Sequence, residues 1–317
     1  MTSDEEIRYL HIRKLILAND PDNEYEFDIS SSSYDRLKDE FGKDVEDDSY
    51  PRLLYDWTRE VVTIVTVPTW LHEETAAFIV NSLFNRAEAL MQGEGIRLAP
   101  GQSLGHCMSP TTLITTAAQI IYFETVDGEK YKVVVEVGVS QTYDSLLDKA
   151  RKWLYDKECG IVVLLAFFEK ERYSAPHRRI SLTSRQRDDQ VVSMRRQWLS
   201  PLFSRFGPLE FGGHTWLDEV SEAFIEVVRK DPDSDGTEAL RTMKYVLIDN
   251  GRDISSSVPR SVGDIRLAEL MPHESLGSDA AAGIVIDFFN SEYFMDIVRR
   301  AVVKTAVERF KNAVKIT

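Results

Sequence analysis

The sequence has few cysteines and lacks the short motifs of the commonest nucleotide-binding and metal-binding proteins. Only Cys107 and Cys159 occur among the 317 residues, and no Cys-x-x-Cys pair or Cys/His cluster accompanies them. A disulfide framework and a structural zinc site are therefore not expected, and so few cysteines are typical of a reducing compartment. Walker loops, GxGxxG loops and internal repeats are absent as well. The sequence thus gives no support for a P-loop or Rossmann-type nucleotide site.

Long apolar runs are also missing. No stretch approaches the about 18 uninterrupted apolar residues that a membrane span needs. The start, MTSDEEIRYL, is acidic and polar rather than basic and then apolar, which is unlike a secretory signal. We therefore expect an intracellular protein, in the cytoplasm or nucleus, with no signal peptide, transmembrane segment or membrane partner. Its 43% apolar and 28% charged residues are typical of a globular protein with a substantial core.

Basic residues are outnumbered by acidic ones, 38 to 52. The formal net charge is −14, which disfavours nucleic-acid binding because contacts to phosphates need a basic surface. Residues 19–50 hold twelve Asp or Glu against three Lys or Arg. We expect this acidic segment to be a loop or weakly ordered arm, either a solvating surface or an interaction arm that occupies a basic groove. The other residues are close to neutral, so the total does not exclude a local basic surface.

Apolar periodicity and turn residues predict alternating helices and strands in the first half of the chain. The predicted elements are a helix over 3–18 with an apolar face of Ile7, Leu10 and Leu17, a strand over 61–67, a helix over 69–91, a hairpin of 117–125 and 131–139, a helix over 143–156 and a strand over 161–168. Strand 131–139 is apolar on both faces, as in the middle of a covered sheet. Because a strand–helix–strand unit forms a right-handed crossover, strands 131–139 and 161–168 should be parallel. We therefore predict an α/β fold in which helices flank a central mixed sheet.

The second half of the chain is less regular. Residues 170–196 are basic, with eight Lys or Arg against three acids. The spacing of apolar residues predicts helices over 214–230 and 291–314 and a strand over 245–248. We divide the chain into an N-terminal helix with the acidic arm (1–54), an α/β core (55–170), a basic segment with an accessory extension (171–280), and a C-terminal amphipathic helix packed on the core (281–317).

One acidic residue stands inside the most apolar strand. In the segment VVVEVGVSQ, Glu136 lies among valines and is followed by Gly138, Ser140 and Gln141. An unpaired charge buried in a sheet is costly, so such a residue is usually kept by a partner, a metal or a catalytic role. Taken alone, Glu136 is compatible with a satisfied structural carboxylate and with a functional one.

The order of these segments resembles a known family. The string VVVEVGVSQTYDSLLDKARKWL, followed by GIVVLLAFFEK, is similar to the core of the PD-(D/E)XK (restriction-endonuclease-like) nuclease superfamily. More narrowly, it resembles a divergent fungal branch in which an E-V-x-x-S-Q strand end precedes a helix and a further strand. Upstream, VPTWLHEETAAF is similar to that branch's first helix. The resemblance covers about residues 55–170, and it implies a restriction-endonuclease-like core with an N-terminal acidic arm and a C-terminal helical extension.

The resemblance implies a Mg²⁺-dependent phosphodiesterase, in which acidic side chains hold the metal and the metal activates water. Glu73 matches the family's helix carboxylate and Glu136 matches its strand carboxylate. The strand before Glu136 has no acid at the family's aspartate position. A hairpin turn near residue 128 is expected to place Gln119 or Ile120 opposite Glu136, which makes Gln119 the third candidate metal ligand. His72, next to Glu73, is a candidate ligand or general base, or a residue that packs near the helix start.

A second departure concerns the family's lysine, which is replaced by Gly138 two positions after Glu136. Gln141, or Lys149 on the following helix, is a candidate to orient the attacking water in its place. The predicted catalytic set is therefore Glu136, Gln141 and Lys149. Candidates for holding nucleic-acid phosphates lie in the basic stretch: Arg178, Arg179, Arg185 and Arg187.

The two departures favour a non-cleaving relative that keeps the fold and binds nucleic acid or another protein. The alternative is an active DNA or RNA nuclease that uses Glu73 and Glu136 with Mg²⁺ as its cofactor. A fortuitous likeness would leave an α/β protein without this chemistry.

Overall fold

The computed structural model describes residues 3–18, 24–41, 52–65, 69–108, 119–139, 141–171, 173, 180–200, 205–233, 238–276 and 279–316. The chain forms two compact units, and the division falls between Thr69 and Trp70. No helix in the described ranges is long and apolar enough to cross a membrane.

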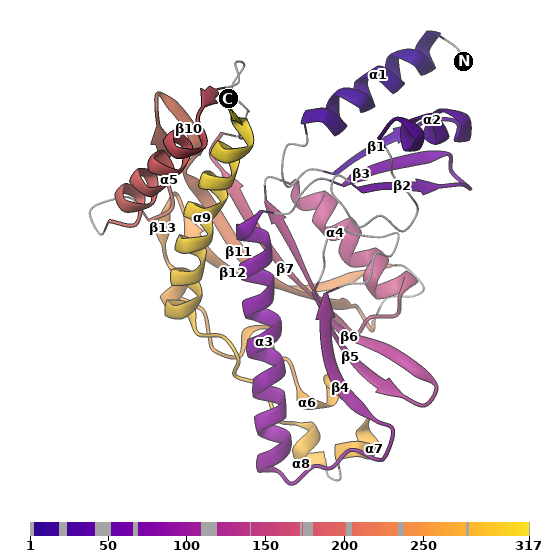
Figure 1. Cartoon of the computed structure of the whole chain (residues 1–317). Coiled ribbons are helices and arrows are strands. Elements are labelled where there is room, and N and C mark those ends of the chain that lie inside the picture. The colour runs from indigo at the N-terminus through magenta and orange to yellow at the C-terminus, as the bar shows by residue number, and fades with distance from the viewer. Residues whose placement is uncertain are drawn as a thin grey trace. The chain divides into compact units, whose positions relative to one another are not determined.

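The first unit packs two helices with a small antiparallel sheet (Figure 1). Its three strands are ordered β1-β3-β2. The elements are α1 (Ser3–Ala18), β1 (Glu24–Asp28), α2 (Ser31–Phe41), β2 (Arg52–Asp56) and β3 (Val61–Val65). The predicted helix over 3–18 and strand near 61–67 are confirmed, but the prediction of a loop is wrong for 24–28 and 31–41. Residues 19–23 and 42–50 of the acidic segment lie outside the described residues.

The buried face of α1 is not the predicted one. Tyr9, Ile12 and Ile16 are buried in the core of the first unit, where they are packed with Leu37 and Val62. By contrast, the predicted apolar face is exposed: Ile7, Leu10 and Leu17 are 63%, 52% and 57% exposed. The sequence of α1 carries two apolar stripes at helical spacing, so periodicity alone does not decide which of them packs against the rest of the unit.

The second unit is built on a mixed sheet of seven strands, ordered β13-β12-β11-β7-β6-β5-β4. Only β6 and β7 run parallel, and the other neighbours are antiparallel. The strands are β4 (Ser103–Met108), β5 (Gln119–Thr125), β6 (Gly128–Val139), β7 (Ile161–Glu169), β11 (Val220–Lys230), β12 (Leu240–Asp249) and β13 (Arg252–Asp253). The predicted α/β class, the hairpin and the parallel pair are confirmed.

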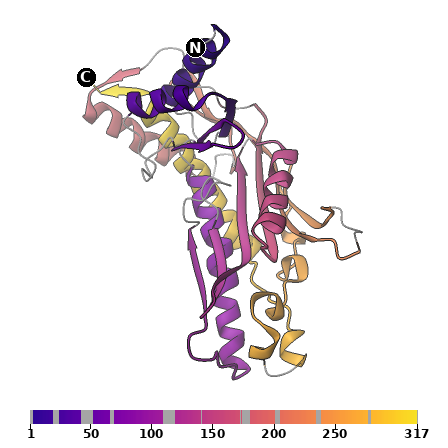
Figure 2. The same cartoon turned by 90° about the vertical axis from the view of Figure 1, so that its right-hand side faces the viewer.

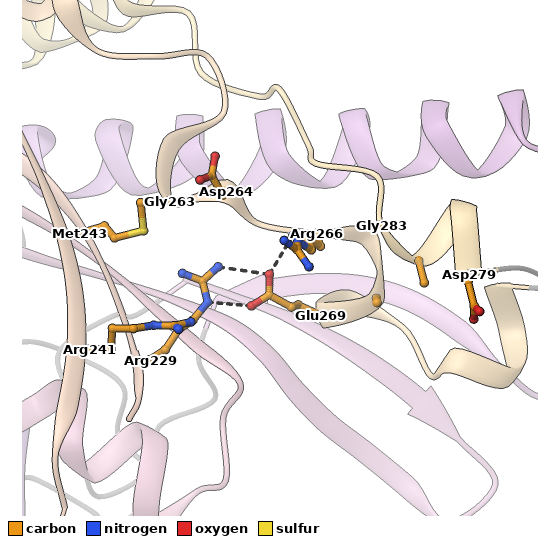
Figure 3. Close-up of a pocket in the computed structure, with 11 residues that line it drawn as sticks. Arg229, Arg241, Met243, Gly263, Asp264, Arg266, Glu269, Asp279 and Gly283 are labelled. Carbon is orange, nitrogen blue, oxygen red and sulfur yellow. Dashed lines mark hydrogen bonds and ion pairs between the residues drawn. The ribbon is translucent and has the colours of Figure 1, made fainter. Parts of the chain in front are cut away.

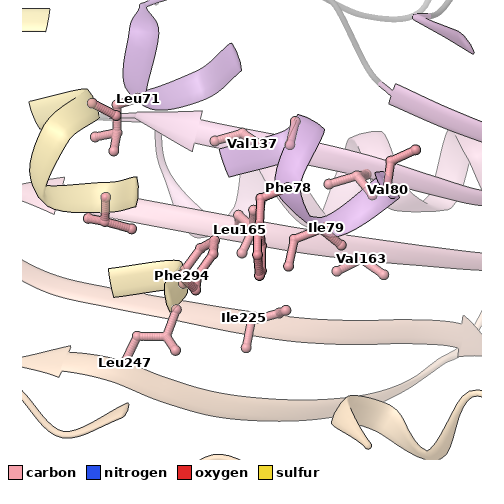
Figure 4. Close-up of a cluster of buried hydrophobic side chains, with 14 of the residues drawn as sticks. Leu71, Phe78, Ile79, Val80, Val137, Val163, Leu165, Ile225, Leu247 and Phe294 are labelled. Atoms are coloured by element: carbon pink, nitrogen blue, oxygen red, sulfur yellow. The ribbon is translucent and has the colours of Figure 1, made fainter. Parts of the chain in front are cut away.

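Helices cover both faces of this sheet (Figure 2). On one face lie α3 (Trp70–Gly93) and α9 (Ser291–Ala313), and α4 (Tyr143–Arg151) with a π-helical turn (Lys152–Asp156) lies on the other. Figure 4 shows the core beneath α3 and α9, where Phe78 and Phe294 meet side chains of the central strands such as Leu165. Because side chains alternate along a strand, Val133, Val135 and Val137 point to this core and the residues between them face α4.

The prediction of a helix over 214–230 is wrong. These residues form β10 (His214–Leu217) and β11, and β11 pairs with β7 on one side and β12 on the other. Trp216, Val220 and Phe224 are spaced four residues apart, which fits a helix as well as a strand. The run Ala223–Val228 is buried on both faces, and pairing with two neighbouring strands decides the outcome.

The remaining elements complete the second unit. The basic stretch contains α5 (Ser184–Trp198), which begins at a capping box between Thr183 and Gln186. The others are β8 (Ile180–Leu182), β9 (Leu209–Phe211), α6 (Leu267–Leu270), α7 (His273–Leu276), α8 (Asp279–Ala282), β14 (Val314–Ile316) and 3-10 turns at Ser255–Ser257 and Val262–Asp264. The strands β11 and β12 and the helix α9 share one core with the expected α/β segment, so the compact unit extends well beyond residue 170.

Candidate functional site

Glu136 lies in the last third of β6, on the face that α4 covers. Glu136 is buried, with only 1% of the residue exposed. The indole Nε1 of Trp153 donates a hydrogen bond of 2.6 Å to Glu136 Oε1, in a buried position. The carboxylate predicted from the sequence to be functional is therefore held in the interior by the turn that follows α4.

Gly138, which stands at the lysine position implied by the resemblance, lies directly beneath α4. A Cβ atom added to Gly138 would lie 2.7 Å from Cδ1 of Leu146 on α4, which is closer than carbon atoms pack. Leu146 is itself fully buried. The close approach of α4 to β6 leaves no room at residue 138 for a long basic side chain.

A second buried carboxylate, that of Glu226 on β11, lies on the same face of the sheet. Leu164 of β7 is in register with Glu136 on one side and with Glu226 on the other. The two acids are therefore two strand spacings apart, about 10 Å between their backbones. We call Glu136, Leu164 and Glu226 the buried acidic row. Glu226 is 1% exposed, and its Oε2 atom has no hydrogen-bond partner among the described residues.

Tyr143, the first residue of α4, engages the second acid. Its hydroxyl donates a hydrogen bond of 3.0 Å to Glu226 Oε1. Burial, and then this hydrogen bond, raise the pKa of Tyr143 to about 12, so the phenol stays protonated and remains a donor at neutral pH. Lys244 is in register with Glu226, but its Nζ lies 3.5 Å from Glu222 Oε1 and 3.6 Å from the centre of the Phe224 ring.

Two of the predicted catalytic residues lie together beside the end of β6. Lys149 is buried in α4, and its Nζ lies 3.5 Å from Oε1 of Gln141. His72, in the first turn of α3, is buried nearby. Burial, and then the positive charge of Lys149, lower the pKa of His72 to about 3, so this histidine is neutral at physiological pH.

The predicted register of Gln119 is wrong. Gln119 pairs with Val135 rather than with Glu136. Because Val135 points into the core under α3, Gln119 belongs to the face opposite to Glu136. The hairpin turn lies at Val126–Asp127, before residue 128, and an irregularity next to Ile121 shifts the pairing further along the strands.

The described residues do not fit the predicted Mg²⁺ site. This ion takes oxygen ligands in near-octahedral geometry and usually keeps several waters, whereas Glu136 is enclosed and accepts the indole hydrogen bond. Gln119 is on the other face, and Glu73 is half-buried in the first turn of α3. Within the described ranges, no group of three or more His, Cys, Asp or Glu side chains could hold a metal.

The predicted phosphate-binding arginines are only partly described. Arg185 is exposed in the first turn of α5, and Arg187 forms an ion pair of 2.9 Å with Asp188. Arg178 and Arg179 lie outside the described residues. A basic nucleic-acid surface on this stretch stays a prediction.

The sequence analysis missed Glu226 of the buried acidic row. It also missed the two residues that donate hydrogen bonds to the row, Tyr143 and Trp153. The signal was present, because AFIEVV around Glu226 repeats the pattern of one acid among apolar residues that drew attention to Glu136. The helical interpretation of 214–230 hid it, since a glutamate on a helix has an exposed face available.

Comparisons with known proteins do not assign this chain to a family: no family model, no curated protein and no solved structure matches it. Chemically, the site offers two buried carboxylates, a protonated phenol, an indole and a buried ammonium group. In this arrangement each carboxylate accepts a hydrogen bond from the segment 143–153, so the acids hold the crossover helix against the sheet.

Proposed function

We propose that this chain is a non-cleaving relative of the PD-(D/E)XK nucleases, which keeps a restriction-endonuclease-like core and binds nucleic acid or another protein. The order of elements supports the core assignment: α3 precedes the β5–β6 hairpin, and α4 joins β6 to the parallel strand β7. This is the order in which the resembling segments occur in the sequence.

One observation carries the proposal. The carboxylate that would hold the metal, Glu136, is 1% exposed and accepts the Trp153 indole hydrogen bond. A metal ligand in a hydrolase must share its site with water and substrate, so it needs an open position. Glu136 instead acts as an internal acceptor that positions the segment after α4.

Charge supports two classes of partner. The exposed Arg185, Arg195 and Arg196 on α5 favour contacts with phosphates. Residues 1–69 hold seventeen Asp or Glu against eight Lys or Arg, which favours a basic protein surface. The salt dependence of binding to labelled DNA and RNA separates the two, because nucleic-acid affinity must fall steeply as salt rises.

The test of non-cleavage uses single-stranded and double-stranded DNA and RNA with Mg²⁺ or Mn²⁺. We expect the wild-type chain to cleave no more than Glu136→Gln. Metal-dependent cleavage by the wild type that is lost in a folded Glu136→Gln variant would overturn the proposal.

An active Mg²⁺-dependent phosphodiesterase using Glu73 and Glu136 is the second candidate. It is favoured by the pairing of Lys149 with Gln141 beside the end of β6, where a water-orienting group is needed. This candidate requires that Lys149→Met also lose cleavage while keeping its far-ultraviolet circular dichroism spectrum.

A further inference from the structure

We propose that a pocket on the opposite face of the sheet from the buried acidic row binds a small molecule that carries a phosphate group. The pocket lies between the β11–β12 pair and residues 263–269 and 279–283, and its volume is about 790 Å³. Pockets of this size accommodate a whole small-molecule ligand. The proposal does not depend on the proposed function, since it involves none of the same side chains.

Three arginines line this pocket: Arg229, Arg241 and Arg266. Arg229 and Arg241 are directly opposite one another in the β11–β12 register, so two guanidinium groups start from neighbouring positions on one face. Like charges at such positions are unfavourable unless an anion compensates them. Figure 3 shows both side chains on the strand side of the pocket, with Arg266 and Glu269 facing them.

Of the three arginines, only Arg229 forms an ion pair within the described residues. Arg229 forms a bidentate ion pair with Glu269, with N–O distances of 2.7 and 3.1 Å. The Arg229 side chain is 11% exposed. The second oxygen of Glu269 also accepts the backbone N–H of Arg266 at 2.8 Å. Glu269 is therefore fully occupied in holding Arg229 and the start of α6.

The guanidinium groups of Arg241 and Arg266 form no ion pair within the part of the chain that the structure describes. Asp264 and Asp279 also line the pocket; in Figure 3 Asp264 lies beside Gly263 and Asp279 lies on the far side beyond Gly283. The lining thus holds three guanidinium groups and three carboxylates, and within the described residues only Arg229 and Glu269 of these six form an ion pair with each other. Arg241 and Arg266 are therefore the lining groups that could meet a bound anion.

The wall opposite the strands is held in place by its backbone. Gly263 has a φ of 69°, and a Cβ atom there would lie 2.4 Å from Cγ2 of Val227 on β11. Asp264 follows with a φ of 46°. Only glycine fits so close an approach in this conformation, so the turn at 263–264 fixes the distance between the strands and α6.

Arginine pairs suit oxyanions, and a phosphate dianion concentrates more negative charge than a single carboxylate. The planar guanidinium donates two parallel hydrogen bonds to phosphate oxygens, and several arginines can share one dianion. A phosphate between Arg241 and Arg266 would fill a small part of the volume. Met243 and Ala268 also line the pocket, and they offer apolar contacts for the rest of the ligand.

The test is isothermal titration of the full chain with adenosine 5′-monophosphate, inorganic phosphate, adenosine and succinate. We expect the two phosphate compounds to bind and the other two not to bind. Arg241→Gln and Arg266→Gln should each weaken nucleotide binding by at least about tenfold, as expected for loss of a charged hydrogen-bonding group. Arg252→Gln, on the exposed strand β13, is the matched control and should leave binding unchanged.

A measurement on the wild-type chain provides an independent check, because a bound ligand should shift the methyl resonance of Met243. The proposal is overturned by the absence of saturable binding at millimolar phosphate or nucleotide. It is also overturned if both arginine variants bind normally, if adenosine binds as tightly as its monophosphate, or if succinate is the preferred anion.

Discussion

Glu136 and Glu226 are in register with the same residue, Leu164, from the two strands that flank β7. Both carboxylates consequently face α4, and each accepts a hydrogen bond from one end of the crossover segment. Tyr143 begins α4 and donates to Glu226, whereas Trp153 follows α4 and donates to Glu136. Glu136, which the sequence associates with chemistry, and Glu226, which the sequence analysis missed, thus fasten a helix to the sheet at both of its ends.

The hydrogen bond between Trp153 and Glu136 should contribute measurably to stability. Trp153→Phe keeps an aromatic ring but removes the donor, so a buried carboxylate loses that hydrogen bond. We expect the free energy of unfolding in urea to fall by about 1–3 kcal/mol. Trp57→Phe, at a residue that is 64% exposed, is the control and should change it little. Equal effects of the two substitutions would show that the indole donor has no special role.

The raised pKa of Tyr143 predicts a loss of stability at high pH. Its pKa is about 12 in the folded chain, against 10 for an ordinary tyrosine. The phenol's contribution is therefore complete below about pH 10 and is lost as the pH rises toward 12, because the unfolded chain ionises first. Urea midpoints measured across this range should fall more steeply for the wild type than for Tyr143→Phe. Tyr293→Phe, at an exposed position, should behave like the wild type, and parallel curves for all three chains would contradict the prediction.

The lowered pKa of His72 predicts a loss of folding stability at low pH. Its pKa is lowered from 6.5 to about 3 by burial and by Lys149. The neutral ring stabilises the fold fully above about pH 6.5, and this contribution is lost as the pH falls toward 3, because the unfolded chain takes up the proton first. His72→Gln should flatten the acid side of the stability curve, and His11→Gln, at an exposed position, should not. An unchanged slope in His72→Gln would refute the assignment.

Gly138 should be intolerant of even a methyl group. Gly138→Ala places its Cβ against the buried Leu146, and such overpacking costs about 1–3 kcal/mol. Gly93→Ala is the control, because no atom lies within 4 Å of a Cβ there. Urea unfolding of both variants measures the difference, and a Gly138→Ala variant as stable as Gly93→Ala would mean that α4 does not pack as described.

The sequence predicts the central fold because its local signals agree there. The valines around Glu136 alternate between two covered faces, and the helix between β6 and β7 has a continuous apolar stripe. The α/β class, the β5–β6 hairpin and the parallel pairing of β6 with β7 follow from these signals. Residues 214–230 are different, because a run that is apolar on both faces satisfies either period, and only pairing with β7 and β12 decides it. That misreading concealed Glu226.

The details of the site depend on features that spacing does not encode. The register of Gln119 is set by an irregularity in β5 and β6, and a shift of one residue moves a side chain to the other face. The identity of the donor to Glu136 depends on how the π-helical turn presents Trp153. Both are consequences of packing between elements rather than of local sequence.

The most direct test of the account is the free energy of unfolding in millimolar Mg²⁺, in millimolar Mn²⁺ and in EDTA. A ligand that binds only the folded state raises this quantity. If Glu136 is an internal acceptor for Trp153, the wild type has the same stability under all three conditions. A metal-dependent increase that disappears in a folded Glu136→Gln variant would show that Glu136 is a metal ligand, and would contradict the account.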